Sequence, residues 1–270
     1  MGKNMSFLRW AGGKSWLVPF VEEITKGLEF NNYFEPFMGG ASVFFSCEVR
    51  GKAYLSDIND ELVNAFCAVR DNPKRVVNYL KEMKTDEQNY YSIRESSPRG
   101  KYQRAARFIY LNATSFNGLY RVNRKGKYNV PYGQKEVTIN CDRLFAIGKK
   151  LEGTTISCQD FASIKSLIKS KDLVFLDPPY TVSKELNCFI EYNPTLFSIE
   201  DQYRLGELID HINEIGAYYI LTNAAHETIQ RIFQGQGRML ALERNSLIGG
   251  KFSYRGKVQE YIFTNIPERS

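Results

Sequence analysis

Seven short apolar runs, each ending at polar residues, glycine or proline, are spread along the chain. Each run has the length of a β-strand rather than that of a helix. Helical patterns lie between several of them, and strands that alternate with helices predict an α/β fold with a mostly parallel sheet. The expected strands are Tyr33–Pro36, Ala53–Asp57, Thr154–Ser157, Leu173–Asp177, Tyr218–Asn223, Met239–Glu243 and Glu260–Thr264.

Two segments between these runs have helical periodicity. Glu61–Arg70 places its apolar residues on one face. Ser198–Ile215 begins with a serine that can cap a helix, and Gly216 follows it, as is typical just after a helix C-terminus. Both segments are expected to be helices that pack on the sheet.

Between residues 71 and 142 the alternation stops, because no buried-strand pattern occurs there. Helical segments lead into a stretch around Asn123-Arg124-Lys125-Gly126 that predicts a β-hairpin with a glycine in its turn. We therefore expect a catalytic domain formed by residues 1–70 and 142–270, with an inserted domain at residues 71–141. The helical segments are Val76–Met83, Tyr90–Arg94 and Gln103–Leu111.

The positive charge is concentrated in the expected insert. The net charge is +6, but Arg99–Lys135 holds nine Lys and Arg and no acidic residue, so the rest of the chain is negative. Seven aromatic residues lie in the same window. Basic residues interleaved with aromatic ones favour a surface that binds phosphates and stacks on bases. A merely solvated basic face is the alternative.

Composition excludes several protein classes. No apolar stretch approaches the roughly 18 residues of a membrane span, and the N-terminus lacks the apolar run of a secretory signal. The five scattered cysteines form no C-x-x-C pair, and with only two histidines they exclude a zinc site. We expect a cytoplasmic protein with reduced thiols, no metal, no membrane contact and no obligate protein partner.

The strongest local motif is Asp177-Pro178-Pro179-Tyr180, directly after an apolar run. A carboxylate at the carboxyl end of a parallel strand points into the ligand crevice of the sheet. The two prolines remove two backbone donors and stiffen the turn. The Asp177 carboxylate and the Pro178 carbonyl can therefore accept both N–H bonds of a planar amino group, while the Tyr180 ring stacks on the base. The alternative is a tight turn after a strand.

A second motif, FEPFMGGAS, joins an expected strand to a glycine turn at Gly39-Gly40, and Asp57 ends the next strand. Such a carboxylate accepts ribose hydroxyls. The fingerprint G-x-G-x-x-G is missing, which favours a nucleoside cofactor over a dinucleotide and excludes a nicotinamide oxidoreductase. RWAGGKS ends in Gly13-Lys14-Ser15, as a P-loop does, but the first glycine of that motif would fall at Leu8, just before this segment, so an NTPase is excluded. Lys14 can instead bind a carboxylate. Asp160-Phe161 is placed to contact an adenine ring, or is an ordinary turn.

Taken in order, these motifs resemble the D12-class, Dam-type N6-adenine DNA methyltransferases over nearly the whole chain. RWAGGKS, FEPFMGG, SDIN and DPPY are similar to the family's N-terminal, cofactor, ribose and catalytic motifs. RAARFIYLNATSFNGLYRVNRKGKYNVPYG is similar to its target-recognition segment, and GGKFSYRGKVQEYIF to its tail. The order of cofactor loop, recognition domain and DPPY is that of the alpha group.

The resemblance implies a Rossmann-like methyltransferase sheet with a small inserted helical and β-hairpin recognition domain, residues 71–141. It implies methyl transfer from S-adenosyl-L-methionine, giving S-adenosyl-L-homocysteine, to adenine N6 in double-stranded DNA, within GATC. Members of the Dam-type group tend to have lysine at position 9, where this chain has Arg9; both side chains can donate to guanine.

The resemblance also implies the roles of single residues. It implies that Asp177, Pro178 and Tyr180 are catalytic and hold the flipped adenine. It assigns the cofactor to Trp10, Lys14, Glu35, Phe37, Gly39, Asp57, Asp160, Phe161 and Asp177. It assigns DNA contacts to Arg9, Phe116, Asn117, Leu119, Arg121, Arg124, Lys125, Lys127 and Pro131.

Two alternatives stay open at this point. Related tetrads serve RNA and protein-amide methyltransferases, although those enzymes usually lack an insert between the cofactor loop and the tetrad. A catalytically inactive DNA-binding module is the other alternative, and the presence of both the tetrad and the cofactor loop disfavours it.

Overall fold

The computed structural model describes residues 6–134, 139–180, 182–183, 188–189, 197–245 and 257–268. The chain forms two compact units, each assembled from separate segments. The first unit contains Met1–Glu22, Met38–Glu48 and Tyr54–Gln159, and the second contains Glu23–Phe37, Val49–Ala53 and Asp160–Ser270. Helix α1 (Val18–Thr25) has residues in both.

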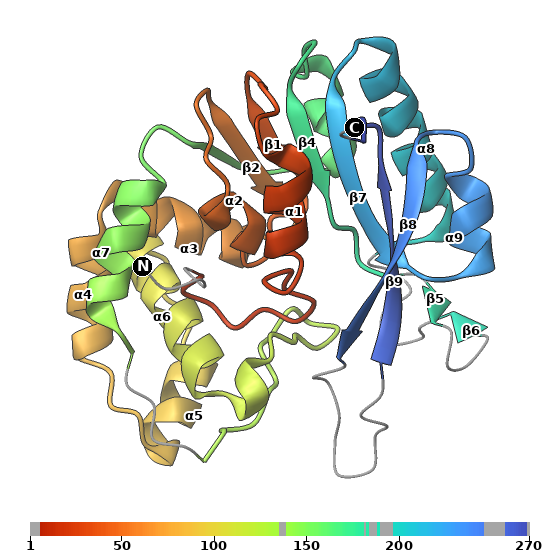
Figure 1. The fold of residues 1–270 in the computed structure, drawn as a ribbon. Coiled ribbons are helices and arrows are strands. Elements are labelled where there is room, and N and C mark those ends of the chain that lie inside the picture. The colour runs from red at the N-terminus through yellow and green to blue at the C-terminus, as the bar shows by residue number, and fades with distance from the viewer. Residues whose placement is uncertain are drawn as a thin grey trace. The chain divides into compact units, whose positions relative to one another are not determined.

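The first unit is mainly helical. Its strands β2 (Ala53–Asp57) and β3 (Thr155–Cys158) pair in parallel, and helix α3 (Asp60–Asp71) follows β2 directly. Asn59 begins this helix by accepting a hydrogen bond from the Leu62 amide at 3.1 Å. Helices α3, α4, α6 and α7 lie side by side in Figure 1. The other elements are α2 (Ser42–Ser46), α4 (Pro73–Lys81), α5 (Glu87–Glu95), α6 (Lys101–Thr114), the 3₁₀ turn η1 (Phe116–Gly118) and α7 (Cys141–Lys150).

The second unit is built on a sheet with the order β1-β4-β7-β9-β8. The first three strands are parallel, whereas β9 is antiparallel to both of its neighbours. Helix α8 packs against β7 and α9, as Figure 1 shows. Every residue of β4 is buried, so this strand is the centre of the unit's core. The strands are β1 (Tyr33–Glu35), β4 (Leu173–Leu176), β7 (Tyr218–Ala224), β8 (Arg238–Asn245) and β9 (Lys257–Thr264); the helices are η2 (Phe161–Ser166), α8 (Ile199–Glu214) and α9 (Glu227–Ile232). A further antiparallel pair joins β5 (Val182–Ser183) to β6 (Cys188–Phe189).

All seven expected strands are present; β2 has the expected bounds, and the ends of the others differ by at most three residues. The capping of α8 is confirmed: Ser198 and Asp201 form a reciprocal capping box, and Gly216 follows the helix with a φ of 70°. The antiparallel arrangement of β8 and β9, and helices α1, α2, α7 and α9, had no counterpart in the sequence-based expectation.

The predicted insert, residues 71–141, lies entirely inside the first unit, whose boundaries fall elsewhere. Its three expected helices are confirmed as α4, α5 and α6. The expected hairpin also forms, although isolated bridges at Val122–Tyr128 and Ser115–Tyr132 take the place of regular strands. That this segment recognises the target stays a prediction.

Candidate active site

The glycine turn after β1 and the carboxylate that ends β2 are bonded to each other in the first unit. The Asp57 carboxylate accepts hydrogen bonds from the Gly39 amide at 3.1 Å and from the Asn59 amide at 3.0 Å. Burial raises the pKa of Asp57, while these backbone donors oppose that shift. The turn is thus held at the strand end, with a partly exposed carboxylate beside it.

Trp10 lies against this turn. A Cβ atom on Gly39 would be 2.8 Å from Cδ1 of the indole, and Gly39 has a φ of 44°, so only glycine fits here. The indole also stacks on the Tyr120 ring, with centroids 5.7 Å apart. Lys14 is only 4% exposed, and its Nζ donates to the Gly12 carbonyl at 3.2 Å. These predicted cofactor residues therefore lie on neighbouring loops of one unit.

The other predicted cofactor residues belong to the second unit. Glu35, at the end of β1, is buried, and its Oε2 accepts a hydrogen bond from the Tyr33 hydroxyl at 2.7 Å. Phe37 stacks on Phe161 with centroids 5.2 Å apart, and Phe197 packs on both rings. Phe37 is the most exposed of the three rings.

Asp160, which was expected to contact an adenine, has structural bonds of its own. Its Oδ1 accepts a hydrogen bond from the Ala162 amide at 2.9 Å and forms an ion pair with the Arg204 guanidinium at 2.6 Å. The Arg204 guanidinium also lies over the Phe161 ring, 4.8 Å from its centroid. Arg204 therefore orders the start of η2, and it is a residue that the sequence patterns did not single out.

The predicted tetrad follows β4 directly. Asp177 and Tyr180 are partly exposed, whereas Pro178 between them is buried. The Asp177 carboxylate accepts a 2.6 Å hydrogen bond from the hydroxyl of Thr222 on β7. A carboxylate held at the carboxyl end of a central parallel strand is the arrangement that the motif predicted.

All nine residues assigned to DNA contact are exposed. Among them Phe116 is 51% exposed and Leu119 is 42% exposed, although both are apolar. Asn117 and Gly118 between them both have left-handed backbone, with φ of 56° and 66°. This double turn presents apolar side chains to solvent next to arginines, which suits insertion into a duplex rather than core packing.

Asn112 ties this turn to the N-terminal segment. Its amide is 2% exposed, accepts a hydrogen bond from the Arg9 amide at 2.8 Å, and donates to the carbonyls of Arg9 at 2.8 Å and of Gly118 at 2.9 Å. A Cβ atom on Gly118 would be 2.6 Å from Cδ of Arg9. Two segments about 100 residues apart in sequence are thus held together, a link that no local pattern signals.

The hairpin holds Arg121 in one orientation. Its Nε donates to Oδ1 of Asn129 across the hairpin at 2.8 Å. The turn is closed by Asn123, whose Oδ1 accepts from the amides of Lys125 and Lys127 at 2.9 and 3.0 Å. Both lysine side chains are exposed. The hairpin tip thus presents two cations from a rigid turn.

The basic window is neutralised in part by acidic residues outside it. Lys101 pairs with Asp71 at 2.5 Å, and Arg104 pairs with Asp60 at 2.5 Å and with Glu61 at 2.7 Å. These two cations at the start of α6 join that helix to α3. The positive charge that remains for a ligand is therefore concentrated on the hairpin.

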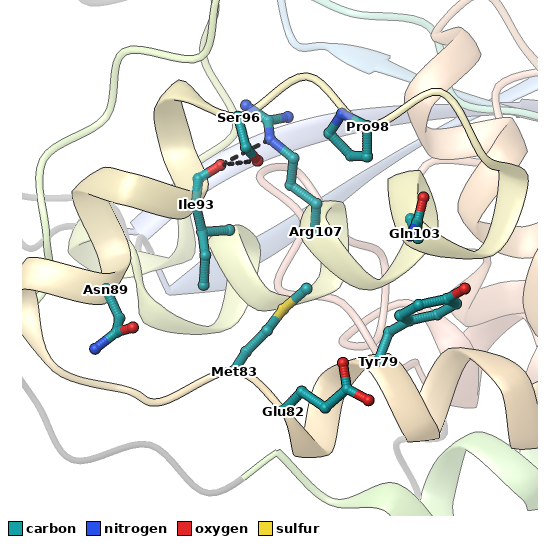
Figure 2. Close-up of a pocket in the computed structure, with 9 residues that line it drawn as sticks. All are labelled: Tyr79, Glu82, Met83, Asn89, Ile93, Ser96, Pro98, Gln103 and Arg107. Atoms are coloured by element: carbon teal, nitrogen blue, oxygen red, sulfur yellow. Dashed lines mark hydrogen bonds between the residues drawn. The ribbon is translucent and has the colours of Figure 1, made fainter.

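Arg107 also serves the helical packing. Figure 2 shows it beside a pocket of about 350 Å³ lined by residues of α4, α5 and α6 and of the loops next to them. Its guanidinium donates to the carbonyls of Ile93 at 3.0 Å and of Arg94 at 2.6 Å. Because these carbonyls end α5, Arg107 caps that helix. Burial lowers the pKa of Arg107.

The comparisons with known proteins now decide the family. Residues 10–246 match the model of the D12 class N6 adenine-specific DNA methyltransferases. The chain belongs to this family. Its α/β fold is accordingly the Rossmann-like fold of methyltransferases, and the expected class of enzyme is confirmed.

Individual relatives agree with this assignment. The type II methyltransferase M1.LlaDCHI of Lactococcus lactis subsp. cremoris is 31% identical, over 96% of this chain and 94% of that protein. The type II methyltransferase M.MjaIII of Methanocaldococcus jannaschii is 33% identical, over 81% and 83%. A DNA adenine methylase of Serratia marcescens is 30% identical, over 97% and 98%.

The described residues were also searched for membrane-spanning helices and metal-binding groups. No helix among them is long and apolar enough to cross a membrane, and no group of three His, Cys, Asp or Glu is arranged to hold a metal ion. Two features of the sequence analysis lie outside the described residues. They are residues 249–256, the first part of GGKFSYRGKVQEYIF, and Lys135 of the basic window.

Proposed function

We propose that this enzyme transfers the methyl group of S-adenosyl-L-methionine to N6 of an adenine flipped out of duplex DNA, and that its target is GATC. The observation that carries the proposal is the tetrad after β4, in which Asp177 and Tyr180 are partly exposed around a buried Pro178. The likeness of residues 104–133 to the Dam-type recognition segment supports GATC.

The tetrad suits the chemistry of an exocyclic amine. Flipping an adenine costs a few kcal/mol, and stacking on the Tyr180 ring recovers about 1–3 kcal/mol. The Asp177 carboxylate and the Pro178 carbonyl accept the two amino hydrogens, which draws the nitrogen lone pair out of the ring system. The carboxylate can also take the proton that N6 loses. Catalysis then consists mainly of positioning and electrostatics.

The residues of the predicted cofactor site fit the parts of S-adenosyl-L-methionine. Asp57 offers a carboxylate to ribose hydroxyls, and the buried ammonium of Lys14 matches an amino-acid carboxylate. The Phe37 ring offers a face to an adenine. When bound, the cofactor supplies an electrophilic methyl group on a sulfonium, and these residues would orient it.

The residues that we propose contact DNA divide into three groups by chemistry. Arg9 and Arg121 can each donate two bonds to guanine O6 and N7, while Phe116 and Leu119 can wedge the duplex open. Lys125 at the hairpin tip is placed for a phosphate. Rigid support for Arg9 and Arg121, from Asn112 and Asn129, favours base reading by both arginines.

Methyl transfer to duplexes with GATC and with each single-base variant, and to RNA of the same sequence, tests the substrate. We expect transfer to GATC duplex alone, and a rise in 2-aminopurine fluorescence at the target position on binding. Asp177→Ala should abolish transfer while DNA affinity persists and cofactor affinity falls far less than kcat. If it keeps more than about a tenth of kcat, a loss below about 1.4 kcal/mol, Asp177 is not catalytic. A preference for another site would refute the GATC assignment.

A further inference from the structure

The hydroxyl of Thr222 is bonded to the proposed catalytic carboxylate. Thr222 is fully buried, and its Oγ1 donates to Oδ1 of Asp177 at 2.6 Å. That distance is in the range of O–H···O⁻ hydrogen bonds to an ionised acceptor, which are about twice as strong as neutral ones. No sequence motif singled out this residue.

The sheet itself brings the two side chains together. Strands β4 and β7 are parallel, with Leu176 opposite Leu221, so Asp177 and Thr222 are the next pair along. Side chains of such a pair leave the sheet on the same face. Threonine is branched at Cβ, so few rotamers are open to it. The position of the hydroxyl is therefore set by the backbone of two central strands.

The residue after Thr222 strengthens this anchoring. The Asn223 side chain donates to Oε1 of Gln202 on α8 at 2.9 Å, and both residues are fully buried. The end of β7 is thus fastened to a helix on one face of the sheet while Thr222 meets Asp177 on the other.

Thr222 differs from the other buried threonines of the described residues. Each of the others donates to a backbone carbonyl: Thr264 to Tyr219 at 2.6 Å, Thr114 to Tyr110 and Thr154 to Leu151, both at 2.7 Å. A backbone carbonyl is the usual partner when a hydroxyl only needs to be satisfied. The Thr222 hydroxyl donates instead to Asp177, a partly exposed residue of the candidate active site.

We propose that Thr222 is a positioning residue for methyl transfer, and that its hydroxyl fixes the rotation of the Asp177 carboxylate that receives the target amino group. The inference deepens the proposed function and rests on it. The terminal torsion of an aspartate is broad, so an unheld carboxylate samples many orientations. A fixed carboxylate meets the amino hydrogens without reorganisation, and small misplacements of reacting groups are costly.

The test compares Thr222→Val, which removes the hydroxyl at nearly constant volume, with Thr222→Ser, which keeps it. We expect Thr222→Val to lower kcat roughly 10- to 100-fold, with KM for cofactor and for DNA changed less than about twofold. Thr222→Ser should restore kcat to within about threefold. Thr222→Ala, expected to behave as the valine variant does, replaces it if that variant does not fold.

Thr264→Val is the matched control, because Thr264 is equally buried, on the adjacent strand β9, with a bond of the same length. It should lower thermal stability as Thr222→Val does, yet keep kcat. Equal kcat in the two valine variants, or failure of serine to restore it, overturns the proposal. Asp177→Ala distinguishes failure of the proposed function from failure of the inference about Thr222. If Asp177→Ala is active, the proposed function is refuted. If Asp177→Ala is inactive but Thr222→Val is fully active, only the role of Thr222 is refuted.

Discussion

Replacing Asn112 with alanine tests how the first unit holds Arg9, which is proposed to read a base. The substitution removes three hydrogen bonds, two with the backbone of Arg9 and one with the Gly118 carbonyl. Because the amide is 2% exposed, water cannot readily replace them. At about 1 kcal/mol for each bond, the free energy of unfolding should fall by roughly 2–4 kcal/mol.

The loss should extend to recognition. Without these bonds, Arg9 is no longer fixed against the turn at Gly118, and its guanidinium can leave the orientation in which we propose that it meets a guanine. Bidentate contacts to a guanine discriminate by about 1–3 kcal/mol, so the preference for GATC over a variant at that guanine should fall by up to about 100-fold. The cofactor KM should change less.

Urea unfolding gives the stability, and kcat/KM on GATC and single-base variants gives the specificity under conditions where the variant is folded. Asn112→Asp should be no better than alanine, because a carboxylate would face two carbonyl oxygens. Asn89→Ala, which removes an exposed amide bonded to Asp86, should change stability by less than about 0.5 kcal/mol. A stable Asn112→Ala, or a destabilised one with unchanged discrimination, would refute the reasoning.

Three further results are expected. Burial raises the pKa of Asp57 above its ordinary 3.8, so the cofactor KM should rise as pH falls through that raised value; the pH dependence should vanish in Asp57→Asn, and an unaltered profile there would exclude the ribose role. The free energy of unfolding depends on pH in the opposite direction. Because the native state holds the Asp57 proton more tightly than the unfolded state, the native state loses stability as the pH rises from 3.8 to the raised pKa. Replacing Lys125 and Lys127 by alanine should lower the slope of log affinity against log salt by roughly 2, equally for all sequences; an unchanged slope would place the tip away from DNA. Arg121→Ala should relax specificity at one base pair, and Asn129→Ala should do so partially, as measured by kcat/KM on the single-base series; a uniform drop would indicate a phosphate contact instead.

The strands and their order along the chain could be predicted because burial leaves a local signature. Four consecutive apolar residues in β4 and the polar residues after them mark both a core strand and its end. The capping of α8 was equally visible, since Ser198 precedes its helical pattern and Gly216 follows it. Helix α7 was missed because four of its apolar residues, Leu144–Ile147, are consecutive and so show no helical spacing. The antiparallel edge of the sheet was missed because strand direction leaves no trace in residue type.

Candidate site residues could be named one by one from the sequence, and their roles stay predictions, but their contacts with one another could not be predicted. Trp10, Gly39 and Tyr120 each lie in or beside a motif. The packing of the Trp10 indole on both Gly39 and Tyr120, however, joins positions up to 110 residues apart, and no local pattern indicates it. The same holds for Asn112 and Thr222, whose neighbours in sequence say nothing of Arg9 or Asp177. Motifs list the groups that touch ligands, whereas the groups that orient them are chosen by tertiary packing. In the first unit, Trp10 contacts both the turn predicted to bind the cofactor and the segment predicted to read DNA, so one side chain joins the two predicted sites.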